Sequence, residues 1–242
     1  MARPIVILHP NPDSVARDAA EHFVKIGTEA ILARGKFLVA LSGGSTPKAM
    51  YEYLLQPQYK DAIDWNVVHI FWSDERFVPY DNSASTYGST KALFIDELSI
   101  PAENIHPMPT ETTLEDASDA YTKTIQKVFG TELPKFDLIY LGMGPDGHTA
   151  SLFPGHEITE GTGMIAIERN SPKPPAERLS FTSQLINNAY IVIFLITGED
   201  KAEMVHKILT EGEKVNVPAA QIFGNVIWLL DDAAGSELKL SH

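Results

Sequence analysis

Four short loops carry the residues whose types and spacing suit chemistry. One of them, Ser42-Gly43-Gly44-Ser45-Thr46, runs from an apolar segment directly into a helix-like one. Its two glycines let the backbone approach a ligand, and the first turn of a helix offers unpaired N–H groups that bind phosphate. A tight turn with Thr46 as the helix cap is the alternative interpretation. No Gly-Lys-Ser/Thr follows, so a nucleoside triphosphate is not indicated.

Charged side chains stand at the ends of other apolar segments. Arg76 follows Asp74 and Glu75, and it could hold a phosphate or carboxylate bidentately while one of these acids orients it. Arg178 and Lys201 stand at further element boundaries. Each cation alone would be an ordinary surface charge. Together, beside a glycine-rich loop in an acidic protein, they would attract an anionic ligand.

A histidine and an acid lie two residues apart in another glycine-rich loop, where Asp146 precedes His148. These are the parts of a general base and the group that orients it. A histidine that caps the start of a helix is the alternative interpretation. No HExxH or comparable spacing of histidines and carboxylates predicts a metal site.

The same loop, Gly142–Gly147, also matches the dinucleotide fingerprint G-x-G-x-x-G, and Glu168 lies about twenty residues further on. A dinucleotide site is disfavoured because Asp146 would set a carboxylate beside a pyrophosphate, and because Pro154 leaves room for only a short helix. The chain has no Cys and no G-x-S-x-G motif. Attack by an activated water is therefore simpler than a covalent acyl-enzyme.

Apolar runs alternate with amphipathic stretches along the chain, which predicts an α/β fold with a doubly wound, mostly parallel sheet and helices on both faces. Strands are predicted at 5–8, 37–41, 67–72, 136–141, 164–167, 178–182, 190–196 and 226–230, and helices at 14–34, 46–55, 85–98, 113–129 and 199–210. Ligands of such sheets bind beyond the carboxyl ends of the strands, where these loops must meet. We expect one domain over residues 1–242, with a small side lobe built from 85–130 or 155–182.

The composition excludes several classes of protein. The chain has 242 residues, of which 44% are hydrophobic, and it contains no Cys, so disulfides and thiolate chemistry are absent. A net charge of -13 argues against nucleic acid as a partner. The apolar run near the start is short, and no window approaches the length of a transmembrane span. We therefore expect a cytoplasmic protein with no membrane partner.

Five segments together resemble, in order and spacing, the 6-phosphogluconolactonase family, which is related to glucosamine-6-phosphate deaminases. They are LSGGSTPKAMYEYL (41–54), FWSDERFVPYDNSASTYG (71–88), YLGMGPDGHTASLFPGH (140–156), ERLSFT (177–182) and TGEDKAE (197–203). The motifs SGGSTP and GxDGH occur in both branches. The continuation TASLFPG (149–155) is similar to the lactonases, because the deaminases carry a Phe-Asn-Glu-Pro stretch whose Glu takes part in their chemistry.

The resemblance implies a modified Rossmann-like fold and hydrolysis of 6-phospho-D-glucono-1,5-lactone to 6-phosphogluconate, a step of the oxidative pentose phosphate pathway. It implies His148 as the general base and Asp146 as its orienting group. Arg76 and Arg178 would meet the phosphate or the developing oxyanion, and Lys201 the phosphate. The residues expected to bind substrate or phosphate are Ser42, Gly43, Gly44, Ser45, Thr46, Asp74, Arg76, Arg178 and Lys201. The family implies no metal or organic cofactor, and we expect a monomer or a weak homodimer.

Three alternatives stay open. A sugar-phosphate deaminase or isomerase on the same fold would release ammonia from glucosamine 6-phosphate. A non-catalytic sugar-phosphate-binding protein would have the cleft without the activity, although the usual DNA-binding helix-turn-helix is not visible. A nicotinamide-dependent dehydrogenase would bind NADP. The Gly and Pro content of segment 155–177 would allow a mobile loop over the substrate.

Overall fold

The computed structural model describes residues 4–156 and 161–238 and contains a seven-stranded, wholly parallel sheet. Its strands follow the order β1-β10-β9-β6-β2-β3-β5. They are β1 (Ile5–His9), β10 (Val226–Asp231), β9 (Val192–Ile196), β6 (Leu138–Leu141), β2 (Phe37–Leu41), β3 (Val68–Trp72) and β5 (Ile105–His106). Because all seven run in one direction, their carboxyl ends lie along one edge of the sheet.

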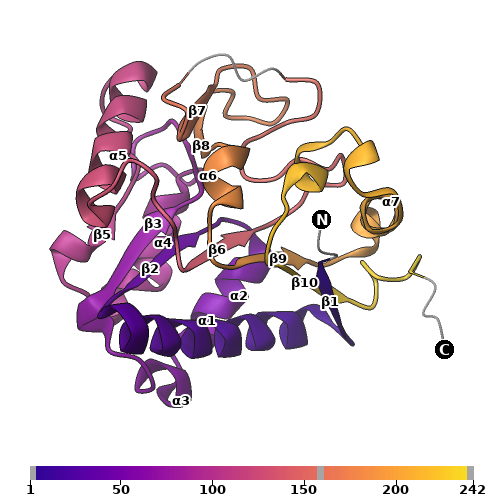
Figure 1. The fold of residues 1–242 in the computed structure, drawn as a ribbon, viewed down its shortest axis with the longest axis horizontal. Coiled ribbons are helices and arrows are strands. Elements are labelled where there is room, and N and C mark those ends of the chain that lie inside the picture. The colour runs from indigo at the N-terminus through magenta and orange to yellow at the C-terminus, as the bar shows by residue number, and fades with distance from the viewer. Residues whose placement is uncertain (1–3, 157–160, 239–242) are drawn as a thin grey trace.

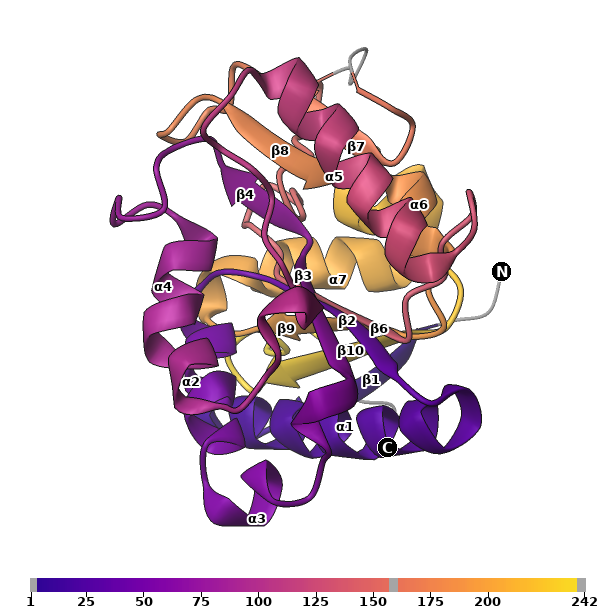
Figure 2. The same cartoon turned by 90° about the vertical axis from the view of Figure 1, so that its left-hand side faces the viewer.

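Helices cover both faces of this sheet (Figures 1 and 2). On one face lie α1 (Pro12–Arg34), α2 (Ser45–Leu54), α3 (Pro57–Lys60) and α4 (Thr86–Leu93); on the other lie α5 (Leu114–Phe129), α6 (Ser183–Asn187) and α7 (Ala202–Glu211). Within 4–156 and 161–238, no helix has the length and apolar character that crossing a membrane requires. The predicted α/β fold is confirmed.

The strands alternate their side chains between two hydrophobic cores, which is why their sequences are almost continuously apolar. In β2, Val39 and Leu41 pack with α1 and α2, whereas Leu38 and Ala40 pack with α5 on the opposite face. All five residues of β2 are buried. This double burial fixes the register of the central strands and hence the positions of the loops that follow them.

Local signals set the helix boundaries. Asn11 caps α1 by accepting a hydrogen bond from the Ser14 N–H at 2.9 Å, so the helix starts slightly before the predicted residue 14. It ends at Gly35, whose φ of 76° lies in the left-handed region. The predicted helix 85–98 is shorter than expected: α4 stops at Leu93, and a 3₁₀ turn follows it. Likewise, a 3₁₀ turn at Glu199–Lys201 precedes α7.

A second, antiparallel sheet of three strands stands above the carboxyl edge, in the order β4 (Asp74–Arg76), β8 (Arg178–Phe181), β7 (Ile165–Glu168). The prediction of a loop at 74–76 was wrong. These three charged residues pair through their backbones with β8, an interaction that no side-chain pattern reports. The side lobe contains parts of both predicted segments: α5 comes from 85–130 and packs on this sheet, and β7 and β8 come from 155–182.

Residues 157–160, part of the predicted mobile segment 155–177, lie outside the described residues. The single domain over 1–242 stays a prediction.

Candidate active site

An open cleft of about 540 Å³ lies where the carboxyl ends of β2, β6 and β9 meet the second sheet. All but one of the predicted site residues line it: Ser42, Gly43, Gly44, Ser45, Thr46, Asp74, Arg76, His148, Arg178 and Lys201. Asp146 is the exception: it does not line the cleft but contacts the Nδ1 atom of His148. The structure therefore gathers segments from five places in the sequence around one cavity.

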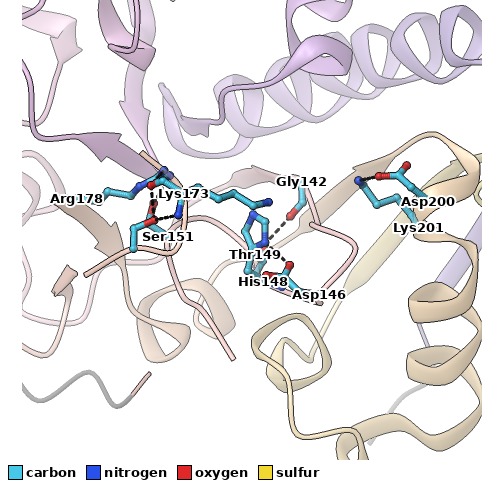
Figure 3. A network of polar contacts seen from close by, with 10 residues as sticks. Gly142, Asp146, His148, Thr149, Ser151, Lys173, Arg178, Asp200 and Lys201 are labelled. Atoms are coloured by element: carbon cyan, nitrogen blue, oxygen red, sulfur yellow. Dashed lines mark hydrogen bonds and ion pairs between the residues drawn. The ribbon is translucent and has the colours of Figure 1, made fainter. Parts of the chain in front are cut away.

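His148 and Asp146 form the hydrogen-bonded pair that the sequence predicted (Figure 3). The Nδ1 atom of His148 lies 2.5 Å from Asp146 Oδ1. An ionised carboxylate only accepts hydrogen bonds, so Nδ1 carries the proton and the Nε2 lone pair is free. Within residues 4–156 and 161–238, Nε2 has no hydrogen-bond partner. The imidazole is therefore arranged to accept a proton from a ligand in the cleft.

Burial lowers the pKa of His148, although the hydrogen bond and negative charge of Asp146 oppose this shift. The charge of Lys173 lowers the pKa further. For Asp146, burial acts to raise the pKa, but the hydrogen bond and charge of His148 outweigh it and the pKa is lowered. At neutral pH the pair is thus a neutral imidazole on an ionised carboxylate, which is the form that a general base needs.

Two neighbours fix the plane of the His148 ring. A Cβ atom at Gly144 would stand 2.0 Å from both Cε1 and Nδ1 of His148, so only glycine fits there. On another side, the Phe153 ring lies 4.9 Å away, centroid to centroid. No helix follows β6 within 142–156, so His148 does not cap a helix and the loop lacks the helix that the dinucleotide fingerprint requires.

The loop 42–46 leads into α2, but its cap differs from the prediction. Gly44, with a φ of 116°, is the N-cap residue, and no side chain caps the helix. The Thr46 hydroxyl instead lies 2.9 Å from that of Thr197, in the loop after β9. The Ser42 Oγ is buried against the cleft and has no partner among the described residues. Hydroxyl and N–H groups at this helix start are therefore available to an anion.

The acids beside Arg76 do not orient it, contrary to the prediction. The Glu75 carboxylate is buried and accepts hydrogen bonds from the N–H groups of Thr86 and Tyr87, so it caps α4. Burial raises the pKa of Glu75, and these hydrogen bonds oppose the rise. Asp74 accepts a hydrogen bond from Ser151 Oγ at 2.7 Å.

The Arg76 guanidinium is held by a backbone carbonyl. Its Nη1 donates to the Ala84 carbonyl at 2.9 Å, and its Nε is buried without a partner in the described part of the chain. Thr86, two residues after Ala84, lies close to Gly43. A Cβ atom added at Gly43 would lie 3.2 Å from Thr86 Cγ2. Arg76 therefore stands beside the loop 42–46.

Arg178 and Lys201 occupy opposite sides of the His148 loop (Figure 3). Arg178 is 4% exposed and donates mainly to backbone carbonyls of residues 173–175. Burial and the nearby Arg76 charge lower its pKa. Lys201 forms an ion pair with Asp200, and the loop that carries it is held by the buried Asp231, which accepts from the Gly198 N–H at 3.0 Å.

Sequence reasoning missed some residues of this cleft. Lys173 and Thr197 line it, and Asp231 supports one of its loops from the end of β10. A lysine between prolines, shortly before the strand with Arg178, was the only signal for Lys173. Among residues 4–156 and 161–238, no group of three or more His, Cys, Asp or Glu side chains is arranged to hold a metal.

The chain is similar to known proteins over nearly its whole length. The family model for glucosamine-6-phosphate isomerases/6-phosphogluconolactonase matches residues 10–228. A 6-phosphogluconolactonase of Synechocystis is 40% identical over 220 residues, which cover 88% of this chain and 89% of the relative. A crystal structure of a protein called devB has a TM-score of 0.88 at 32% identity and covers 98% of this chain and 100% of the other.

The 6-phosphogluconolactonase of Trypanosoma brucei is also similar in structure. It has a TM-score of 0.84 at 28% identity, over 99% of this chain and 100% of that one. The matched family model spans most of the sequence, from the first helix to the last strand. This chain therefore belongs to the glucosamine-6-phosphate isomerase/6-phosphogluconolactonase family.

Proposed function

We propose that this protein is a 6-phosphogluconolactonase, which hydrolyses 6-phospho-D-glucono-1,5-lactone to 6-phospho-D-gluconate. The names of its relatives support the activity. The observation that carries it is the free Nε2 of a neutral His148, facing a cleft that four cations line: Arg76, Lys173, Arg178 and Lys201. A base beside several positive charges suits the hydrolysis of an anionic ester.

In the proposed reaction, His148 Nε2 takes a proton from water as the water oxygen bonds to the lactone carbonyl carbon. Asp146 stabilises the imidazolium that forms. The tetrahedral intermediate then breaks the bond to the ring oxygen, which receives the proton from His148. The ring opens to a carboxylic acid, which ionises at neutral pH. No covalent enzyme intermediate is needed, and the fully buried Ser151 hydroxyl is already bonded to Asp74.

The phosphate is proposed to bind at the start of α2. The loop that carries Lys201 contacts the start of α2 through the hydrogen bond between Thr197 and Thr46. Arg76 is bonded to the Ala84 carbonyl, close to Thr86, which lies beside Gly43. The helix N-terminus and the two cations would then surround the phosphate. This placement leaves the lactone end of the sugar near His148.

A coupled assay tests the proposal. Glucose-6-phosphate dehydrogenase generates the lactone, and its disappearance with the purified protein is compared with spontaneous hydrolysis. We expect the protein to accelerate the loss of lactone and to release no ammonia from glucosamine 6-phosphate. A lactone decay equal to the spontaneous rate would refute the proposed activity. The cytoplasmic location and the monomeric or weakly dimeric state stay predictions.

A further inference from the structure

The Pro-rich segment 171–177 places a lysine in the cleft to which the mechanism above gives no role. Lys173 lines the cleft with His148. Its ammonium group has no hydrogen bond or ion pair with any described residue. Figure 3 shows its side chain extending from beside Arg178 toward the His148 ring. This charge is therefore free to act on a bound ligand near the general base.

The backbone of Lys173 is held more firmly than its exposed position would suggest. Its carbonyl accepts hydrogen bonds from Arg178 Nη2 and from Ser171 Oγ, each at 2.8 Å. The Nε of Arg178 donates to the Pro175 carbonyl at 3.1 Å. Arg178 is buried on β8, so it ties the loop to the second sheet. A side chain on a braced loop loses less entropy when it binds a ligand.

We propose that Lys173 binds the lactone carbonyl oxygen as negative charge develops on it, and that Arg178 is the positioning residue that fixes the loop carrying Lys173. The inference rests on the proposed lactonase function and deepens it. The reacting carbon must lie within one water of His148 Nε2, and Lys173 extends toward this ring. Arg76 and Lys201, which line the same cleft as the start of α2, are the cations proposed above to bind the phosphate. A cation placed where the oxyanion forms stabilises the transition state.

Binding of two phosphorylated ligands separates this role from phosphate recognition. The product 6-phosphogluconate has a carboxylate at C1, where glucitol 6-phosphate has an uncharged CH₂OH. We expect Lys173→Met to weaken 6-phosphogluconate by about 10-fold, as loss of one charge-assisted hydrogen bond does, and to leave glucitol 6-phosphate unchanged. Lys207→Met, which removes an exposed cation of α7 outside the cleft, is the matched control. Equal losses for both ligands, or none, would overturn the proposal.

Kinetics supply a second readout. Lys173→Met should lower kcat by about 10²-fold, and Lys173→Arg should keep most of the activity. The charged groups that act on His148 are Asp146, Lys173 and Asp74. Removing the positive charge of Lys173 should raise the pKa of His148, which moves the acid limb of the kcat profile to higher pH. An unchanged kcat and acid limb would contradict the role of Lys173. An inactive wild-type protein would instead refute the lactonase function itself.

A double-mutant cycle tests the positioning role. If Arg178 acts through Lys173, adding Arg178→Gln to Lys173→Met should lower kcat much less than Arg178→Gln does alone. Independent, multiplying losses would contradict the proposed coupling. If Arg178→Gln does not fold, Arg178→Lys replaces it. That variant keeps the buried positive charge but removes the guanidinium that donates to both the Lys173 and the Pro175 carbonyls.

Discussion

Two histidines in the region 142–168 each hold a carboxylate through Nδ1, yet their surroundings differ. His148 lies 2.5 Å from Asp146, and His156 lies 2.8 Å from Glu168. In the first pair the acid is 41% exposed and the imidazole 16% exposed. In the second the order is reversed, with the acid 6% and the imidazole 32% exposed.

This difference in exposure indicates, for each pair, which side chain supports the other. The carboxylate of Asp146 lies behind the ring and leaves Nε2 directed at the polar cleft, so the acid supports the histidine. Glu168 is buried and also accepts from the Asn170 N–H at 2.6 Å, so the histidine satisfies a carboxylate that cannot reach water. The same contact thus supports chemistry in one place and folding in the other.

The sharpest test of this comparison replaces each histidine by alanine. His148→Ala should lower kcat by about 10²–10⁴-fold, with a small change in KM and in melting temperature, because it removes a general base. His156→Ala should keep kcat but lower the free energy of unfolding by about 1–3 kcal/mol, since buried Glu168 loses a partner. Lactonase kinetics and denaturant unfolding measure both. Equal kinetic losses in the two variants would contradict the comparison.

A substitution beside the ring should damage His148 without removing it. Gly144→Ala places a Cβ where the imidazole stands, so the ring must move, and we expect about a 10²-fold loss of kcat. The wild type is the reference, because Gly142, the neighbouring glycine without a close contact, itself lines the cleft. The kcat values of the variant and the wild type, measured with matched melting curves, decide the outcome. A Gly144 variant as active as the wild type would show that the ring orientation does not matter.

A histidine pair without a carboxylate extends the comparison to stability at low pH. His69 Nδ1 and His106 Nε2 lie 3.2 Å apart on β3 and β5. Burial and the His69 charge lower the pKa of His106 to about 4, so the unfolded chain takes up its proton first as the pH falls. Stability should drop by about 2 kcal/mol between pH 7 and pH 4.5 through this group.

Urea unfolding across this pH range measures the effect. In His106→Gln the fall in stability between pH 7 and pH 4.5 should be smaller, since one neutral buried imidazole has been removed. An identical pH dependence in the variant and the wild type would show that this pair does not cause the loss of stability at low pH.

The smallest expected effects concern the phosphate end of the cleft. Arg76→Ala and Lys201→Ala should each weaken 6-phosphogluconate by about 10-fold, as loss of one charge-assisted hydrogen bond does. Gluconate, which lacks the phosphate, should be affected less. Calorimetric titration with both ligands checks this. Equal losses for the two ligands would show that neither side chain binds the phosphate.

The sequence was sufficient for six of the seven strands of the main sheet, all but the two-residue edge strand β5, and for most of the loops at its carboxyl edge. Runs such as Phe37–Leu41 and Val192–Ile196 are apolar throughout because both of their faces are buried, and this pattern is visible in a sequence. The pair of Asp146 and His148 was also predictable, since two residues so close in the chain can meet through local backbone geometry alone.

Contacts between distant residues were not predictable in this way. Glu75 caps a helix that starts eleven positions later, and the charged strand Asp74–Arg76 exists only because β8 pairs with it. Thr46 bonds to Thr197 rather than capping its own helix. Each depends on tertiary partners that neither periodicity nor local propensity reports.

The pH dependence of kcat tests the central claim most directly. At saturating lactone, ionisation of the substrate phosphate mainly affects binding, so kcat reports groups in the enzyme–substrate complex. Burial lowers the pKa of His148 in the free protein, so the imidazole is a neutral base at neutral pH. We expect kcat to fall on the acid side as the imidazole of the complex is protonated, and we expect this limb to be lost in His148→Ala. A limb of the same midpoint that persists in His148→Ala would show that another group removes the proton from water.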